Sequence, residues 1–280
     1  MIEGIENQIM YSTLQIEVTH HKQPSSFGTG FLFMFDNNFP CLITNKHVVE
    51  SFEKVYVRFT QADENQNPLL GQFIECDITN CLTYAIPHPD TEVDLVAIPL
   101  KPILCVVEET KQKAFMYFYS FDSIPNSDDW KWICPGKDVL MIGYPLSIID
   151  KKNNLPIVRK GAIATIPTVD FDTDHGFLLD ISCNKGSSGS PIIAIRYGYQ
   201  VDLETGKIDE LKDFRLIGIQ CKGYDSHKPI TITVKGKPVD QNVEIVQTTN
   251  LAIVAPSTDL IRLNEIIVER FFRNQQHSQP

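Results

Sequence analysis

The segment NKGSSGSP at residues 184–191 contains a serine that could attack a carbonyl group. It follows the alternating stretch GFLLDISC, and its glycines, serines, asparagine and proline are residue types that form turns. An ordinary turn is therefore one interpretation of the segment. The other is a turn that presents Ser188 as a nucleophile. A serine nucleophile needs a base to take the hydroxyl proton and a third group to orient that base.

A histidine and a carboxylate elsewhere in the chain fit these two roles. His47 lies in LITNKHVVE, where a strand of apolar residues ends and a turn begins. Asp94 lies in EVDLVAIPL, at the start of a strongly apolar strand, where a partly buried acid needs a partner. Taken alone, each has an ordinary interpretation, a satisfied or surface histidine and a capping aspartate. The order His47, Asp94, Ser188 favours a base, an orienting acid and a nucleophile.

Another class of enzyme with an exposed serine, the α/β-hydrolases, fits the sequence less well. Its nucleophile turn is G-x-S-x-G, whereas residue 190 here is serine. Its catalytic residues follow the order Ser, Asp, His, and only His227 and His277 come after Ser188. Its parallel sheet would also need helices that this sequence lacks.

The cysteines favour packing over metal or disulfide chemistry. Cys76 and Cys81, followed by His88, fit no common zinc spacing and lie in a segment that is typical of a strand. The seven cysteines are an odd number without the density of a disulfide scaffold, so we expect reduced thiols, Cys183 among them buried. We expect no metal ion and no cofactor.

The composition is that of an ordinary globular protein and argues against two kinds of partner. The 280 residues carry 25 basic and 35 acidic side chains, a net charge of −10, with no cluster of lysine and arginine. We therefore expect no nucleic-acid partner. The start of the chain has no basic and apolar leader, and no run reaches the roughly 18 apolar residues of a membrane span. We therefore expect no membrane segment and a cytoplasmic location.

Short β-rich runs separated by turn residues dominate the chain, and they fall into two sets. Many strands with few helical patterns favour antiparallel barrels or sandwiches. The first set predicts an N-terminal β lobe over 1–107 that carries His47 and Asp94. The second predicts a C-terminal β lobe over 132–255 that carries Ser188.

Two further segments complete the predicted organisation. The charged, aromatic and polar stretch 108–131 would cross between the lobes, with a short helix in its first half. Apolar residues at 260, 263, 267 and 271 have helical spacing after Pro256. Residues 256–280 should therefore form a helix that covers one lobe, followed by a tail.

Taken together in their order, these motifs resemble the chymotrypsin-fold serine peptidases of the trypsin-like class, and within it most of all the bacterial high-temperature-requirement type. The similar segments are FGTGFLF, CLITNKHVV, VDLVAIPL, DVLMIGYPL, RKGAIATI, NKGSSGSP and NLAIVAPSTDLI. They extend from about residue 26 to 265, and each is weak alone while their joint order is specific. The resemblance implies an all-β fold of two antiparallel six-stranded β-barrels, one in each lobe, with a C-terminal α-helix.

The resemblance also implies a role for each candidate residue. His47 would be general base and then general acid, Asp94 would hold its ring and stabilise the imidazolium, and Ser188 would attack. The backbone N–H groups of Gly186 and Ser188 would form the oxyanion hole. The implied function is a serine endopeptidase that hydrolyses a protein or peptide substrate through an acyl-enzyme intermediate.

The specificity pocket of the family maps to a few residues around the nucleophile. Ser182, six residues before it, would form the base, and Lys185 could touch substrate. The wall would be formed by Cys221, Lys222 and Gly223. Without an acid at 182, we expect a small or apolar side chain before the scissile bond rather than arginine or lysine.

The chain departs from the family in its activation signal. Secreted trypsin-like enzymes carry an aspartate immediately before the nucleophile, which pairs with a freshly cut N-terminus, but residue 187 is serine. Packing, a protein partner or substrate must then order the oxyanion hole. Because an unrestrained cytosolic peptidase would endanger its own cell, we expect narrow specificity or gating by an activating protein. We also expect no PDZ module, which usually follows the helix in the high-temperature-requirement type. The alternative function is a latent or inactive module of this fold that acts as a protein-binding scaffold.

Overall fold

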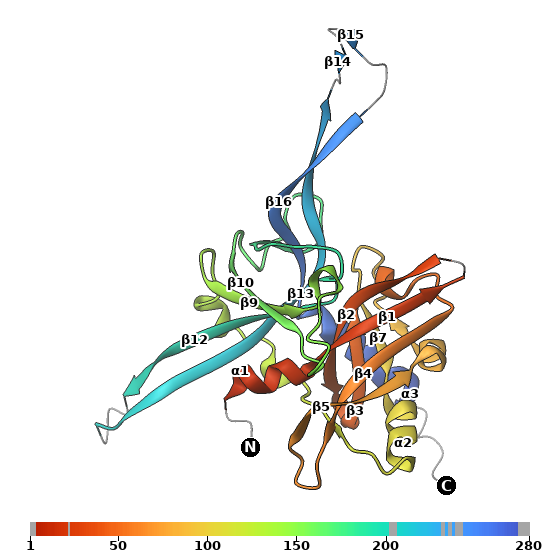
Figure 1. Ribbon diagram of the computed structural model, residues 1–280. Helices are drawn as coiled ribbons and strands as arrows, with labels where there is room; N and C mark the ends of the chain where they lie inside the picture. Colours follow the sequence, from red (N-terminus) through yellow and green to blue (C-terminus); the bar gives the residue numbers. More distant parts are fainter. Residues whose placement is uncertain are drawn as a thin grey trace.

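The computed structural model describes residues 4–21, 23–201, 206–230, 233–234, 237–238 and 243–273. Strands are the commonest elements among them, and these strands form two neighbouring lobes (Figure 1). Every pairing between named strands in the described part of the chain is antiparallel. This confirms the expected antiparallel β protein and excludes the parallel sheet of an α/β-hydrolase.

The first lobe is an eight-stranded sheet in the order β5-β4-β1-β2-β3-β7-β6, with β8 paired to β4. Its strands are β1 (Thr13–His20), β2 (Gln23–Phe35), β3 (Phe39–Thr44), β4 (Lys54–Ala62), β5 (Pro68–Asp77), β6 (Ile86–Pro87), β7 (Val96–Pro99) and β8 (Ala114–Phe115). Among the described residues no pairing joins the end strands β5 and β6. A closed six-stranded barrel in this lobe is therefore not confirmed.

The second lobe is a closed barrel of six strands in the order β10-β11-β16-β13-β12-β9. These strands are β9 (Asp138–Gly143), β10 (Ile157–Ile163), β11 (Phe177–Asp180), β12 (Pro191–Val201), β13 (Ile208–Ile230) and β16 (Val243–Pro256). Every second residue of a strand faces the same side, and Ile192 and Ala194 of β12 both lie in the apolar core of this lobe. One of the two expected six-stranded barrels is thus confirmed.

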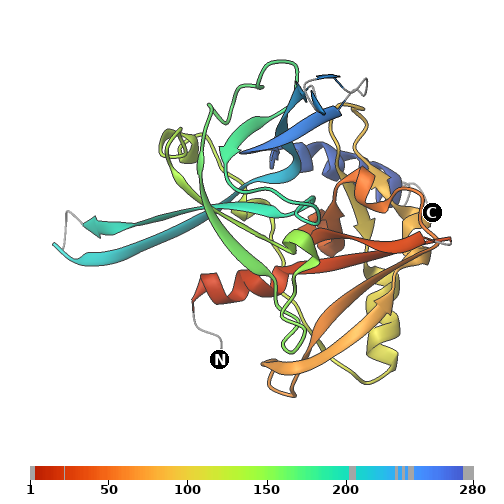
Figure 2. The ribbon, with the colours of Figure 1, turned by 45° about the horizontal axis from the view of Figure 1, so that its top comes forward.

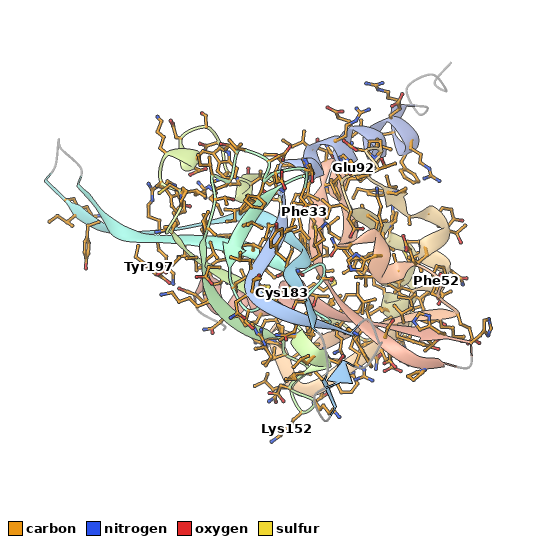
Figure 3. All side chains as sticks on the ribbon, turned by 90° about the horizontal axis from the view of Figure 1, so that it is seen from above. Phe33, Phe52, Glu92, Lys152, Cys183 and Tyr197 are labelled. Carbon is orange, nitrogen blue, oxygen red and sulfur yellow. The ribbon has the colours of Figure 1, made fainter. Side chains whose placement is uncertain are left out.

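A shared core joins the two lobes. It contains Phe31 and Phe33 from β2, and Ile142, Ile193 and Ile219 from three strands of the barrel, all fully buried. Figure 3 shows Phe33 in the middle of the densely packed region. This apolar contact keeps the two lobes side by side. Residues from the loops of both lobes can therefore meet at their boundary.

The expected C-terminal helix is present as α3 (Asp259–Phe271). Its buried residues Leu260, Leu263 and Ile267 follow the predicted helical spacing and belong to the shared core. Of the tail that we expected after the helix, RNQQHSQP, all but Arg273 lies outside the described residues.

Two pairs of barrel strands extend beyond the barrel as long arms (Figures 1 and 2). The first is the β12–β13 hairpin, which pairs from Pro191↔Ile219 out to Val201↔Ile208. The second is β13 with β16, next to the short strands β14 (Thr233–Val234) and β15 (Lys237–Pro238). Tyr197 on the first arm is 61% exposed, so this arm projects into solvent (Figure 3).

The remaining helices are short. They are α1 (Ile5–Gln8), α2 (Lys101–Glu109) and the 3₁₀ turns η1 (Ile9–Ser12), η2 (Asp36–Asn38), η3 (Lys46–Val49), η4 (Thr79–Tyr84), η5 (Phe121–Ser123), η6 (Asp129–Lys131) and η7 (Pro145–Ser147). We expected a short α-helix in the first half of 108–131, and this position was wrong. The helix in this region is α2, which begins at Lys101 and ends at Glu109. Within the described ranges, no helix is both long enough and apolar enough to cross a membrane.

Candidate active site

His47 follows the buried strand β3 (Phe39–Thr44), as the sequence predicted. The strand ends at Thr44, and the chain then turns through η3, where the His47 side chain is 46% exposed. Asn45 between them is fully buried. Its Nδ2 donates to the carbonyl of Asp94 at 2.7 Å and to Cys221 Sγ at 3.4 Å. Asn45 therefore ties the base of this turn to the other lobe.

Asp94 lies two residues before β7 (Val96–Pro99), which pairs with β3. The pairing Thr44↔Val96 brings the residues that flank the two strands together. Asp94 Oδ2 lies 2.5 Å from His47 Nδ1, and Oδ1 accepts a hydrogen bond from the backbone N–H of His47 at 3.3 Å. A carboxylate can only accept, so Nδ1 carries the proton and Nε2 is left as a base.

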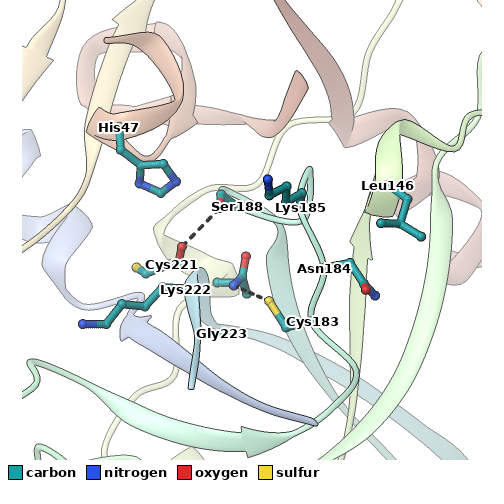
Figure 4. A pocket seen from close by; sticks show the side chains of 10 residues that line it. His47, Leu146, Cys183, Asn184, Lys185, Ser188, Cys221, Lys222 and Gly223 are labelled. Carbon is teal, nitrogen blue, oxygen red and sulfur yellow. Dashed lines mark hydrogen bonds between the residues drawn. The ribbon is translucent and has the colours of Figure 1, made fainter. Parts of the chain in front are cut away.

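Ser188 lies on a turn that is held between the two lobes. Its carbonyl accepts a hydrogen bond from the N–H of Thr29 at 2.9 Å, and the N–H of Gly189 donates to the carbonyl of Gln220 at 2.9 Å. The Ser188 hydroxyl donates to the carbonyl of Cys221 at 3.2 Å. His47 and Ser188 line the same cleft (Figure 4), although among the described residues no hydrogen bond joins these two side chains.

The peptide between Lys185 and Gly186 has a defined orientation. The Lys185 carbonyl accepts a hydrogen bond from the N–H of Leu146 at 2.6 Å. The C=O and N–H of a trans peptide point in opposite directions, so the N–H of Gly186 points away from Leu146. In the part of the chain that the structure describes, nothing accepts a hydrogen bond from the N–H of Gly186 or of Ser188. Two such free donors are what an oxyanion hole requires.

Gly186 must be glycine for two reasons. Its φ is +90°, a conformation that side-chain-bearing residues rarely adopt. A Cβ at this position would also lie 2.4 Å from the carbonyl oxygen of Tyr144. The sequence segment therefore encodes one specific turn, in which the carbonyl of Gly186 accepts a hydrogen bond from Thr29 Oγ1 at 2.7 Å.

Thr29 supports this turn from the first lobe, and its removal should lower stability. The buried hydroxyl donates to Gly186 and accepts from the N–H of Tyr144 at 3.1 Å. We expect Thr29→Val to lower the free energy of unfolding by about 1–3 kcal/mol, because two buried backbone groups lose their partner. Urea denaturation measures this, with Thr29→Ser, which keeps the hydroxyl, as the milder control. Equal stability of Thr29→Val and the parent protein would contradict this role.

The cleft beside Ser188 has a volume of about 370 Å³. It is lined by His47, Leu146, Cys183, Asn184, Lys185, Ser188, Gln220, Cys221, Lys222 and Gly223. Four residues that we assigned to substrate binding thus lie there: Lys185, Cys221, Lys222 and Gly223. Ser182 does not line the cleft; it is exposed, and its carbonyl accepts a hydrogen bond from Arg159 at 2.7 Å.

Cys183 and Gln220, which we did not expect to contact substrate, line the cleft. Cys183 is half-buried and exposed to the cleft, not fully buried as expected. Gln220 is fully buried, and its Nε2 donates to Cys183 Sγ at 2.9 Å. The alternation of β13 could have indicated Gln220, but a β-bulge between Gln220 and Lys222 changes which residues face the cleft.

Among the described residues that line the cleft, the charged and ionisable groups are two lysines, the imidazole of His47 and two thiols. Lys222 pairs with Asp174 at 2.7 Å, and Lys185 is exposed at the rim. No carboxylate is among the described residues that line the cleft. Burial raises the pKa of the Cys221 thiol to about 12, so this cysteine is a protonated packing group rather than a nucleophile. The hydroxyl of Ser188, the nucleophile that the sequence predicted, lines the same cleft.

The cysteines that we considered as metal ligands pack inside the first lobe. Cys76 and Cys81 are buried in its apolar core, and burial raises the pKa of Cys76 to about 11. In the described ranges, no three histidine, cysteine or acidic side chains are grouped so that they could hold a metal ion.

Comparisons with known proteins give a family and a distant structural likeness. Residues 28–201 match the family model described as "Trypsin-like peptidase domain". A crystal structure of the MamO protease domain from Magnetospirillum magneticum, in its apo form, is similar with 12% sequence identity and a TM-score of 0.47. That match covers 92% of this chain and 97% of the other. No curated protein matches the sequence.

Proposed function

The chain belongs to the trypsin-like peptidase family, and from this premise we propose that it is a serine endopeptidase with Ser188, His47 and Asp94 as its catalytic residues. One observation carries the proposal: Asp94 forms a hydrogen bond with Nδ1 of His47, and His47 lines the same cleft as Ser188. The free N–H groups of Gly186 and Ser188 add the donors that peptide hydrolysis needs.

The proposed reaction proceeds through an acyl-enzyme. His47 Nε2 takes the hydroxyl proton as Ser188 Oγ bonds to the carbonyl carbon, and the carbonyl oxygen becomes an oxyanion that accepts from the N–H groups of Gly186 and Ser188. The imidazolium, stabilised by Asp94, returns that proton to the leaving amine as the C–N bond breaks. Water then repeats the same steps on the ester and releases the carboxylic acid.

Labelling of Ser188 tests this proposal. A fluorophosphonate probe should form one covalent adduct with the parent protein, located at Ser188 by peptide mass spectrometry. The matched control is Ser188→Ala, and Ser187→Ala serves as a neighbour control because Ser187 is fully buried. A parent protein that stays unlabelled, alone and with cell extract added, would contradict the proposal.

One observation favours a second candidate, a latent or inactive module that acts as a protein-binding scaffold. The Ser188 hydroxyl is engaged by the carbonyl of Cys221 and must rotate before it can reach His47. Rotation between staggered positions needs no backbone change, so substrate or an activating protein could drive it. The proposal therefore includes narrow specificity or gating by a partner. Labelling that appears only with added extract would support gating.

Three finer parts of the proposal stay predictions. They are the likeness to the high-temperature-requirement type without a PDZ module, the cytoplasmic location, and the division of the chain at 107, 131 and 255. The substrate is a protein or a peptide.

A further inference from the structure

Gln220, one of the residues that line the cleft, has a buried polar atom without a partner. Gln220 on β13 is fully buried, and its Oε1 has no hydrogen-bond donor among the described residues. The other half of the same amide is engaged, because Nε2 donates to Cys183 Sγ. A buried carbonyl oxygen without a donor is unfavourable and therefore uncommon. Such an atom on a residue that lines a cleft is a candidate contact for a ligand.

Gln220 lies directly beside the nucleophile turn. Its backbone N–H donates to the carbonyl of Ser190 at 2.9 Å, and its carbonyl accepts from the N–H of Gly189. Gln220 and Cys183 line the same cleft as Ser188, and the dashed line from Cys183 in Figure 4 marks the bond to the Gln220 amide. A substrate side chain that enters the cleft next to the attacked carbonyl would therefore meet this amide.

The lining of the cleft restricts the side chains that could satisfy Oε1. Lysine or arginine would bring a donor, but Lys185 and Lys222 already line the cleft, and no described lining residue is a carboxylate. Glutamate would place a second acceptor against Oε1. An apolar side chain would exclude water and leave Oε1 without a donor. Binding of such a side chain is then weakened, because a buried polar group stays unpaired. A neutral side chain with an N–H donor avoids all three conflicts.

On the basis of the proposed function, we infer that Gln220 Oε1 accepts a hydrogen bond from the side chain before the scissile bond and selects a neutral amide there, glutamine above all. This replaces the small or apolar residue that the sequence led us to expect. In this inference Gln220 forms the base of the specificity pocket. We had assigned that role to Ser182, which does not line the cleft.

Binding to an inactive chain tests the inference without any hydrolysis. Four fluorescein-labelled peptides of sequence Ala-Ala-Ala-X end in glutamine, methionine, glutamate or lysine, which have similar length and differ in charge and donors. Their dissociation constants are measured by fluorescence anisotropy with full-length Ser188→Ala. We expect the glutamine peptide to bind at least about tenfold more tightly than each of the others, since one unsatisfied buried acceptor has about this effect.

A second variant identifies the residue responsible. In Ser188→Ala combined with Gln220→Met, which keeps the length of the side chain, the preference for glutamine over methionine should disappear. Ser188→Ala combined with Ser182→Ala is the matched control and should keep the preference, since Ser182 is outside the cleft. Melting curves show whether each variant is folded. If the Gln220→Met variant does not fold, the four peptides measured on Ser188→Ala, which keeps Gln220, test the inference by themselves.

The inference is overturned if the methionine, glutamate or lysine peptide binds as tightly as the glutamine peptide, if no peptide binds, or if a folded Gln220→Met variant keeps the preference. These outcomes are independent of the labelling of Ser188. A chain that binds the glutamine peptide selectively but is never labelled would retain this site and lose the proposed enzymatic function.

Discussion

Replacing Asp94 by asparagine is expected to lower kcat by about 10⁴-fold, with little change in KM. The carboxylate holds His47 at two points, the ring Nδ1 and the backbone N–H. An asparagine in the same place can present its own N–H to the ring and stabilise the wrong tautomer, in which Nε2 carries the proton. The base would then be unable to take the proton of Ser188. Steady-state kinetics on a peptide that the parent protein cleaves measure the effect.

Asp90→Asn is the matched control for this experiment. Asp90 lies in the same loop, is exposed, and its Oδ1 accepts a hydrogen bond from the N–H of Glu92 at 3.0 Å. We expect its variant to keep kcat within about twofold, because surface replacements have small effects. Similar activity of Asp94→Asn and Asp90→Asn would show that Asp94 does not orient the base.

Replacing Gly186 by alanine is expected to lower kcat by about 10²–10³-fold, the typical effect of losing one oxyanion donor. The added Cβ would lie 2.4 Å from the carbonyl oxygen of Tyr144, and the φ of +90° is unfavourable for alanine. The peptide between Lys185 and Gly186 must rotate to relieve both conflicts, which moves the N–H of Gly186. Kinetics of the purified variant on the same peptide measure the loss.

Gly136→Ala separates the crowding from the backbone effect. Gly136 has a similar φ of +84°, but nothing lies within 4 Å of a Cβ built there. This variant should lose about 1–2 kcal/mol of stability and keep its kcat. If Gly186→Ala keeps the kcat of the parent protein, the free N–H of Gly186 has no part in catalysis.

The sequence identified the candidate residues His47 and Asp94 more reliably than it identified the lining of the cleft. His47 and Asp94 could be recognised because each stands out at the end of an apolar strand, and the structure places them within 2.5 Å of each other. Their contact depends on the pairing of β3 with β7, two strands that lie far apart in the sequence. Local patterns identified the strands, but no local pattern reports which strand pairs with which.

The same limit explains the differences between expectation and structure. Closure of the first lobe would require β5 to pair with β6, and neither strand carries a signal for its partner. The pocket assignment counted six residues back from Ser188 and reached Ser182, which is not among the residues that line the cleft. The sequence analysis did not identify Gln220 as a cleft residue, because the bulge that follows it interrupts the alternation of β13.

The most direct test of the account is a crystal structure with a peptide boronic acid, which forms a tetrahedral adduct with a serine nucleophile. The account predicts a bond from Ser188 Oγ to boron and His47 Nε2 within hydrogen-bonding distance of the adduct. One boronate oxygen should lie about 2.7–3.1 Å from the N–H groups of Gly186 and Ser188. Boron bound elsewhere, or a Lys185 carbonyl turned into the position of that oxygen, would contradict it.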